Sequence, residues 1–400
     1  MQTGVILSGV RTPIGKLNGS LAPLTAVELG GISIKEAICR SGAQPNDIQH
    51  VIMGQVLQGG SGQIPSRQAA FKAGLDKTVT SETINRVCGS GMRAITLAET
   101  LIRVGEDEVV VAGGMESMSN APYLLRKARG GYRMGDGVLE DMMIGDGLMC
   151  ALEGCHMGIH GSNVAAEEGV GRVEQDAWAL RSHQRYFTAL DRGALADEIV
   201  PVEIADRKGK KTVSEDEAPR RDTSAEALAS LKPAFDRAGT VTAGNAPGVN
   251  DGAAAVVLAS EAWAQAQGLK PRARILAHAA AAWGPAYLAY TPAMATELAL
   301  QRAGLSVGDV KLFEINEAFA SVSMISARKL GADPEIVNVN GGAVAIGHPI
   351  GASGTRIVIA LMNELRRRGG GIGVAAICSG GGQGDAIVLD VLAADAEGIF

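Results

Sequence analysis

The sequence has few of the residues on which several large classes of protein depend. Aromatic residues make up 4% of the 400 residues, and there are only five cysteines, an odd and widely scattered set. Such a set does not build a disulfide framework and favours a reducing compartment. No apolar stretch reaches the length of a membrane span without charges or glycine-rich breaks. The net charge of −6 shows no basic bias, so we expect neither a membrane nor nucleic acid as a partner.

Signals for export, nucleotide phosphates and metal ions are missing as well. A strand-like run begins at residue 4, which leaves no room for a signal peptide, and the last residues are not a peroxisomal address. Neither glycine motif that cradles nucleotide phosphates occurs between a strand and a helix. No cysteine pair has zinc-finger spacing, and His156 beside Cys155 does not suffice for a metal site. We therefore expect a cytoplasmic protein without a metal ion.

The residues that are abundant indicate an α/β fold. Glycine occurs 53 times, and the chain is 46% hydrophobic and 20% charged, which is typical of a soluble globular protein. Short β-branched runs alternate with helical patterns, so we predict mixed, mainly parallel sheets packed in layers with helices. A chain of this length exceeds one hydrophobic core, and two or more domains are expected.

An internal repeat divides the chain. Residues 37–42 resemble residues 299–304, and residues 90–93 resemble residues 353–356 at almost the same separation. A helical pattern and an apolar strand that ends in glycines follow each copy, which predicts two duplicated βα-rich halves. We place the N-terminal half at residues 1–117 plus 250–271, an inserted loop domain at 118–249, and the C-terminal half at 272–400.

Cys88 is the strongest candidate for a reactive residue. It follows an apolar approach and opens a helix through a glycine-rich turn, so free backbone N–H groups and the helix dipole are expected to favour its thiolate. The alternative is a small buried apolar cysteine. The repeat places Cys88 opposite Gly351, which predicts that two helix N-termini face one centre.

Three other segments carry reactive groups where open α/β sheets bind ligands, after a strand or before a helix. Asn316 follows the strand-like residues 312–315, His348 stands between glycine and proline, and Cys378 precedes three glycines. A base within reach of a cysteine would complete a nucleophile. The alternatives are a turn histidine, a turn asparagine and a buried cysteine at a strand end.

These four segments resemble, in order, the active-site blocks of the thiolases, which comprise acetyl-CoA C-acetyltransferases and 3-ketoacyl-CoA thiolases. The matching blocks are residues 87–91, 316–320, 347–354 and 378–384, and the resemblance extends from residues 11–16 to near the C-terminus. It implies the thiolase fold, with two duplicated halves and a loop domain that serves CoA binding and oligomerisation. It also implies a homodimer or homotetramer.

The resemblance implies a role for each reactive residue. Cys88 is the nucleophile that becomes acylated, and His348 activates it. Cys378 is the acid/base that acts on the methyl carbon of the second acyl-CoA. Asn316 positions a water that forms one oxyanion hole with His348, and the backbone N–H groups of Cys88 and Gly380 form the other. Acyl-CoA and CoA are the substrates and no separate cofactor is needed.

The family also implies a CoA site in the loop domain. His156 and Met157 resemble the pair that borders the pantetheine and acyl group in the short-chain biosynthetic type, and Arg220 matches a residue near the adenine. The other positions that match CoA contacts are Leu148, Ala243, Pro247, Ala318 and Phe319. Pro247 replaces a serine of many members and so removes a hydroxyl and an N–H. Residues 287–292 replace a stretch whose methionine lines the family's acyl pocket.

The implied reaction is the reversible Claisen condensation of two acetyl-CoA to acetoacetyl-CoA and CoA, by a ping-pong mechanism through an acyl-cysteine. One alternative is a 3-ketoacyl-CoA thiolase of fatty-acid β-oxidation with longer chains. A non-catalytic acyl-CoA or lipid-binding protein on this scaffold is another. A β-ketoacyl synthase-like enzyme would pair its cysteine with two histidines, whereas Asn316 and Cys378 favour a thiolase.

Overall fold

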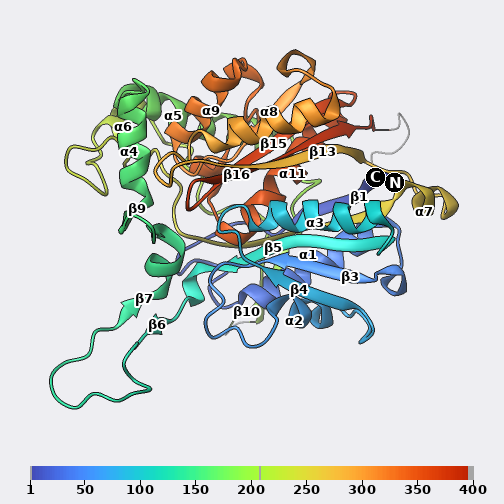
Figure 1. Cartoon of the computed structure of the whole chain (residues 1–400), viewed down its shortest axis with the longest axis horizontal. Coiled ribbons are helices and arrows are strands. Elements are labelled where there is room, and N and C mark those ends of the chain that lie inside the picture. The colour runs from blue at the N-terminus through green and yellow to red at the C-terminus, as the bar shows by residue number, and fades with distance from the viewer. Residues whose placement is uncertain (1, 207–208, 395–400) are drawn as a thin grey trace.

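The computed structural model describes residues 2–206 and 209–394, in five alternating layers of helices and strands (Figure 1). The expected outer limits of the two halves, residues 1 and 400, and residues 207–208 of the loop domain lie outside the described residues. Among the described helices, none is both long and apolar enough to cross a membrane.

Two similar sets of strands form one mixed sheet that is folded over on itself. The first set has the order β1 (Gly4–Arg11), β12 (Asn250–Ser260), β5 (Val109–Ser117), β3 (His50–Gly54) and β4 (Thr80–Ile84), and β2 (Gly15–Lys16) pairs with β12. The second set has the order β13 (Ala273–Ala282), β16 (Gln383–Val391), β15 (Gly371–Ser379) and β14 (Leu312–Ile315). The sets join where β1 pairs with β13. The repeated order is the structural counterpart of the repeat in the sequence.

The direction of the strands corrects one expectation. The sheet is mixed, but parallel pairing is confined to β3–β4, β3–β5 and β14–β15 among the described strands. The longer ladders, such as β12–β5 and β13–β16, are antiparallel. The expectation of a mainly parallel sheet was wrong because β12 and β16 return between strands that the βα pattern alone would make neighbours.

Helices cover both outer faces and fill the space between the two sets. Alternate residues of β1 show this division, since Val5 and Leu7 pack with α1 (Ala26–Ser41) and α2 (Pro65–Lys72), whereas Ile6 packs with the central helices. The central pair is α3 (Ser90–Val104) and α11 (Ile350–Arg367), and α8 (Thr291–Ala303) and α9 (Ala320–Leu330) cover the other outer face.

The central helices touch at glycines. A Cβ added to Gly354 would lie 2.4 Å from the backbone nitrogen of Met92, and one added to Gly91 would lie 2.8 Å from the carbonyl oxygen of Gly351. The small residues therefore allow the first turns of α3 and α11 to pack backbone against backbone. This contact brings the two helix N-termini to one centre, as expected from the repeat.

The segment between β5 and β12 supplies the remaining wall of the site. Its elements are η2 (Met118–Asn120), β6 (Tyr123–Leu124), β7 (Glu140–Asp141), the π-helical η3 (Met143–Leu148), β8 (Met149–Cys150), β9 (Cys155–His156), α4 (Met157–Glu167), α5 (Arg172–Asp191), β10 (Val202–Asp206), β11 (Gly209–Val213) and α6 (Ala225–Ala229). The short elements elsewhere are η1 (Pro45–Asp47), α7 (Glu261–Ala266), η4 (Val307–Asp309), η5 (Pro334–Ile336) and α10 (Ala343–Ile346).

Candidate active site

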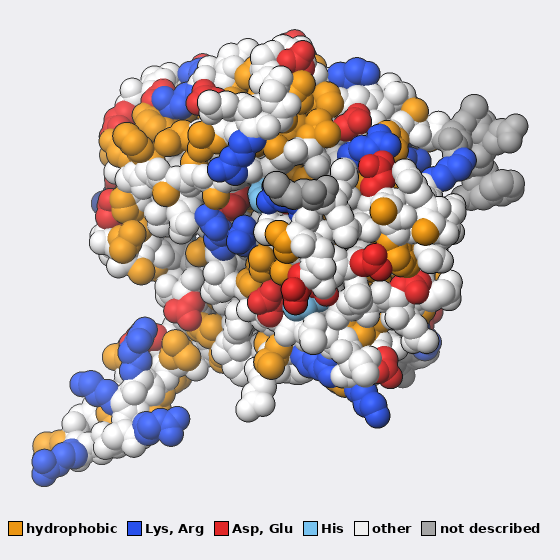
Figure 2. All heavy atoms as spheres, turned by 45° about the vertical axis from the view of Figure 1, so that its right-hand side comes forward, with side chains coloured by type: hydrophobic (Ala, Val, Ile, Leu, Met, Phe, Trp, Pro, Cys, Tyr) orange, Lys and Arg blue, Asp and Glu red, His pale blue; other side chains and the backbone are white. Residues whose placement is uncertain are grey.

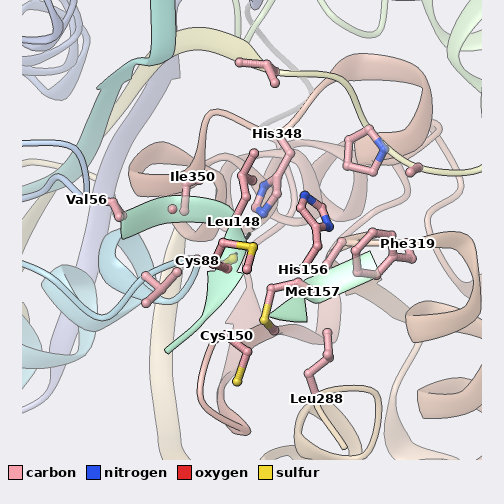
Figure 3. A pocket seen from close by; sticks show the side chains of 18 of the residues that line it. Val56, Cys88, Leu148, Cys150, His156, Met157, Leu288, Phe319, His348 and Ile350 are labelled. Carbon is pink, nitrogen blue, oxygen red and sulfur yellow. Dashed lines mark hydrogen bonds between the residues drawn. The ribbon is translucent and has the colours of Figure 1, made fainter. Parts of the chain in front are cut away.

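A cavity of about 670 Å³ lies where the two halves meet the inserted segment. Most of the residues singled out in the sequence line it: Cys88, Leu148, His156, Met157, Ala243, Pro247, Ala318, Phe319, His348, Cys378 and Gly380. Figure 3 shows the side chains of Cys88, His348 and His156 converging on this space from different parts of the chain. Residues far apart in the sequence therefore share one site.

The turn that carries Cys88 is strained and firmly held. Val87 has a φ of +47°, a left-handed conformation that is costly for a β-branched residue. The Oδ1 of Asn85 accepts a hydrogen bond of 2.9 Å from the N–H of Val87, and the Oγ of Ser90 accepts one of 2.8 Å from the N–H of Arg86. These bonds fix the sulfur two residues before the start of α3.

His348 reaches Cys88 from the other half of the molecule. Its Nε2 lies 3.2 Å from the Sγ of Cys88, and its Nδ1 lies 2.6 Å from the Oγ of Ser353. The Ser353 hydroxyl donates to the carbonyl oxygen of Pro349 at 3.0 Å. Because that hydroxyl has a single proton, we assign the Nδ1–H of His348 as the donor to Ser353. The lone pair of Nε2 then faces the thiol, as a base requires.

The backbone of His348 is anchored by a residue that the sequence did not single out. The N–H of His348 donates to the Oδ1 of Asn250 at 2.9 Å, and the Nδ2 of Asn250 donates to the carbonyl oxygen of Gly15 at 2.9 Å. Gly347 has a φ of +113°, which favours glycine, and any Cβ there would collide with Asn250. The only sequence signal for this contact was an asparagine at the start of an apolar strand.

The protonation states differ from the expectation of a resting thiolate. Burial raises the pKa of Cys88 to about 12, although the N–H groups of Cys88 and Gly380 counteract this shift. Burial and the charge of Arg356 lower the pKa of His348 to about 3. The expected stabilisation of the thiolate was wrong for the resting site, because the loss of hydration outweighs the backbone donors. The resting pair is a thiol and a neutral imidazole.

Cys378 lines the same cavity as Cys88. Cys378 lies at the end of β15, and the Oγ of Ser379 donates to the carbonyl oxygen of Arg86 at 2.5 Å. Arg86 also forms an ion pair of 3.0 Å with Asp385. Burial, with the nearby sulfur of Cys88, raises the pKa of Cys378 well above its usual value. The thiol is therefore the resting form of both cysteines.

Asn316 lies behind the cavity wall. It follows β14, its N–H donates to the carbonyl oxygen of Ala376 at 2.9 Å, and its Oδ1 accepts a long bond of 3.5 Å from Arg356. The side chain is buried, and its Nδ2 has no hydrogen-bond partner within residues 2–206 and 209–394. A buried amide donor without a partner is costly, so this atom still has a hydrogen bond left to give.

Two buried carboxylates stabilise the backbone around these residues. Glu317 accepts hydrogen bonds from Trp178, Ser182, Asn338 and Val344, and so holds the loop that follows β14. Glu116 accepts bonds of 2.9–3.0 Å from the N–H groups of Val56, Leu57 and Gly351. Burial raises the pKa of Glu116 to about 7. Glu116 was not predicted from the sequence, where its one signal was a charged residue inside an apolar strand.

The far end of the cavity has an aromatic and apolar wall. His156 stacks on Phe235 with ring centroids 3.9 Å apart, and its Nδ1 accepts the N–H of Gly158 at the start of α4. Leu288, from the stretch that departs from the family pattern, lines the same space. Arg220 is exposed and lies outside the cavity lining. The structure therefore brings together the expected pantetheine-side residues but not Arg220.

Known proteins match nearly the whole length of the chain. Residues 4–262 match the thiolase N-terminal domain, and residues 269–391 match the thiolase C-terminal domain. The acetyl-CoA acetyltransferase of Escherichia coli strain K12 is 51% identical over 393 residues, which cover 98% of this chain and 100% of that protein. The acetyl-CoA acetyltransferase of Pseudomonas aeruginosa is 49% identical over 390 residues, 97% and 99% of the two chains. The crystal structure of the Bacillus anthracis acetyl-CoA acetyltransferase has a TM-score of 0.96 at 43% identity, over 98% and 99% of the two chains.

Proposed function

Because the chain belongs to the thiolase family and is an acyltransferase, we propose that it joins two acetyl-CoA molecules into acetoacetyl-CoA and CoA through an acyl group on Cys88. The reverse reaction, thiolysis of acetoacetyl-CoA, uses the same groups. The observation that carries this proposal is the 3.2 Å approach of the Nε2 of His348 to the Sγ of Cys88, in a cavity that Cys378 also lines.

The first half-reaction transfers the acetyl group. Nε2 of His348 takes the thiol proton as the Sγ of Cys88 attacks the thioester carbon, so a thiolate exists only while it is needed. The tetrahedral intermediate collapses, the bond to the CoA sulfur breaks, and Cys378 donates its proton to the leaving CoA thiolate. The high pKa of Cys378 supports this role, because the resting residue carries the proton to give.

The second half-reaction forms the carbon–carbon bond. The Cys378 thiolate removes a proton from the methyl group of the second acetyl-CoA, and the resulting enolate attacks the acyl carbon on Cys88. The carbon–sulfur bond then breaks, and the Cys88 thiolate recovers its proton from His348. Cys88, His348 and Cys378 all return to their starting forms, so no separate cofactor enters the proposed reaction.

Two sets of donors stabilise the negative oxygens. The N–H groups of Cys88 and Gly380 already act on the sulfur of Cys88, which supports a role at the oxygen of a bound acyl group. The unpartnered Nδ2 of Asn316 supports the second set, in which a water held by Asn316 and the Nε2–H of protonated His348 face the enolate oxygen. Removing one donor from an oxyanion hole costs about 10²–10³ in rate.

The walls of the cavity favour a short acyl chain. Leu288 and Met157 both line the space, and His156 on Phe235 closes its side. The names of the relatives, acetyl-CoA acetyltransferases, favour the same choice. A 3-ketoacyl-CoA thiolase for longer chains is the second candidate. Initial rates with acetoacetyl-CoA and with 3-ketoacyl-CoAs of increasing length distinguish the two.

Self-association is part of the proposal. The loop between β6 and β7 projects from the body of the molecule (Figure 2), and Met134 at its end is 97% exposed. Its other exposed apolar side chains are Leu125, Tyr132, Val138 and Leu139. Exposed apolar groups of this number are typical of a contact surface. We propose a homodimer or homotetramer in the cytoplasm, and light scattering of the intact chain measures its mass.

The proposal is tested by mass spectrometry after the protein is mixed with acetyl-CoA. The expected result is one acetyl group on Cys88 and the release of an equal amount of CoA. An adduct on another residue, or the absence of both adduct and CoA release, contradicts the mechanism. The absence of both would also favour the non-catalytic acyl-CoA-binding alternative if CoA binding itself persists.

A further inference from the structure

A second group of reactive side chains lies beside the cavity, where the β8–β9 hairpin meets the first turn of α4. Its members are Glu153, Cys155 and His160, none of which takes part in the proposed reaction. Glu153 is on the turn of the hairpin, Cys155 begins β9, and His160 is the fourth residue of α4. One ligand atom from each of the three lies within 4.8 Å of the other two.

Two of the three distances within this group suit a metal ion, and the third is no more than 4.8 Å. The Nε2 of His160 lies 3.4 Å from the Sγ of Cys155 and 3.6 Å from the Oε2 of Glu153. Bonds of about 2.0–2.3 Å from a tetrahedral zinc ion place pairs of ligand atoms about 3.3–3.8 Å apart. The Nδ1 of His160 lies farther from Cys155, at 3.9 Å, so the geometry selects Nε2 as the ligand.

The surroundings hold the ligands in place. The side chain of His160 is 3% exposed, so packing fixes its ring on the inner face of α4. The backbone of Cys155 lies opposite that of Cys150 in the β8–β9 ladder, and this register sets the direction of the Cys155 side chain. Glu153 is exposed at the open side of the group, where an ion can enter from solvent. Two ligands are thus preorganised and the third is free to close on the ion.

We propose that Glu153, Cys155 and His160 form a zinc-binding site with one coordination position left for water. One thiolate, one imidazole and one carboxylate are the ligands that zinc accepts together, whereas Mg²⁺ and Ca²⁺ avoid sulfur. The thiolate and the carboxylate also balance the charge of a divalent ion. No metal site was expected from the sequence, because the histidine next to Cys155 in the chain is His156. In the fold, His160 is the histidine that lies beside the Sγ of Cys155.

The position of this site indicates what a bound ion would do. His156 and Met157, which line the acyl-CoA cavity, lie between two of the ligands in the sequence. An ion bound by both Cys155 and His160 would link the hairpin to the helix, and His156 and Met157 lie in the short segment between these two ligands. The site would therefore stabilise the wall of the substrate cavity without entering the chemistry at Cys88.

The test uses the full chain with Cys88→Ala, which removes the Cys88–His348 pair as a competing place for a metal. With the thiols kept reduced by a phosphine, Co²⁺ is added and the visible spectrum recorded. Zn²⁺ affinity is then measured by competition with a chromophoric chelator. We expect one Co²⁺ per chain, with the sulfur charge-transfer band and strong d–d bands of a tetrahedral thiolate site, and its displacement by Zn²⁺.

Two mild substitutions in this background locate the site. Cys155→Ser should abolish the sulfur band, and both Cys155→Ser and Glu153→Gln should weaken Zn²⁺ binding by about tenfold or more, since even outer-shell losses cost about 10–100-fold. Glu153 is exposed, so its substitution tests the site without a risk to folding. Two control substitutions at exposed positions elsewhere, Cys39→Ser and Glu106→Gln, should change neither the sulfur band nor the Zn²⁺ affinity. A parent protein without the tetrahedral spectrum, or unchanged Zn²⁺ affinity in either ligand variant, overturns the proposal.

Discussion

The Nε2 of His348 lies 3.2 Å from the Sγ of Cys88, although the two residues come from opposite halves of a duplicated chain. Cys88 is held from within the first half, whereas Asn250 of the first half also holds the backbone of His348 in the second. Hydrogen bonds from Asn85 and Ser90 fix the turn before α3, and Asn250 fixes the backbone of His348. The close packing of α3 on α11 at Gly91 and Gly354 sets the separation between the two sides. The duplication thus creates a reactive pair that neither half contains alone.

The reactivity of Cys88 should reveal its resting thiol. Because burial raises the pKa of Cys88 to about 12 and lowers that of His348 to about 3, the free enzyme has a neutral pair. The rate of alkylation of Cys88 by iodoacetamide, mapped by mass spectrometry, should rise about tenfold per pH unit up to at least pH 9. Exposed Cys39 serves as the internal reference for the reagent. A rate that is already level between pH 5 and pH 7 would show a resting ion pair instead.

Ser353 should act through the orientation of His348. In Ser353→Ala the Nδ1–H of His348 loses its acceptor, so the ring and its tautomer are no longer held. We expect the rate of acetyl transfer to Cys88 to fall about tenfold to a hundredfold, less than the full loss of about 10²–10⁴ expected without a base. Ser326→Ala is the matched control, because Ser326 is also buried and donates to a carbonyl far from His348 in sequence. Equal acylation rates in the two variants would contradict the assigned role.

Glu116 should make the stability depend on pH. Its pKa is raised from 4.5 to about 7 in the folded protein, so the folded state holds a proton that the unfolded state releases. Stability from this group is complete below pH 4.5 and is lost as the pH rises to 7. The free energy of unfolding in denaturant, measured relative to Glu116→Gln, should fall by about 3 kcal/mol over this range. A difference that stays constant or grows with pH contradicts the raised pKa.

Leu288 should limit the length of the acyl chain. Leu288→Ala removes side-chain volume from the cavity wall and should admit longer substrates. The ratio of kcat/KM for 3-ketohexanoyl-CoA to that for acetoacetyl-CoA should rise about tenfold, since a methylene in an apolar pocket is worth about 10–200-fold. Leu298→Ala, on the exposed side of α8, is the matched control and should leave the ratio unchanged. The same ratio in both variants would place the limit elsewhere.

Much of this arrangement could be predicted from the residues, for a physical reason. The repeat was visible because each half needs the same small residues where α3 meets α11, and the reactive side chains stand at strand ends beside those turns. The sheet direction was not predictable from local patterns, because the antiparallel places of β12 and β16 depend on long-range pairing. The roles of Asn250 and Glu116 were also hidden, since their partners lie far away in the sequence.

The protonation of Cys88 was mispredicted for a related reason. The helix N-terminus is a local feature and could be read from the glycine-rich turn. The burial that dominates the pKa of Cys88 comes from the inserted segment and the other half, which no local pattern describes. The candidate zinc ligands illustrate the same limit, because Cys155 and His160 meet only once α4 has formed.

The division of labour between the two cysteines is the central claim, and a single-turnover experiment on Cys378→Ala tests it most directly. Rapid quenching with acetyl-CoA, followed by mass spectrometry, measures acetylation of Cys88, and the same samples measure acetoacetyl-CoA. The account predicts that acetylation stays within about tenfold of the wild type, because the CoA thiolate can leave before it is protonated. Condensation should fall by about 10²–10⁴, because deprotonation of carbon needs the Cys378 base. Equal losses of acetylation and condensation would contradict it.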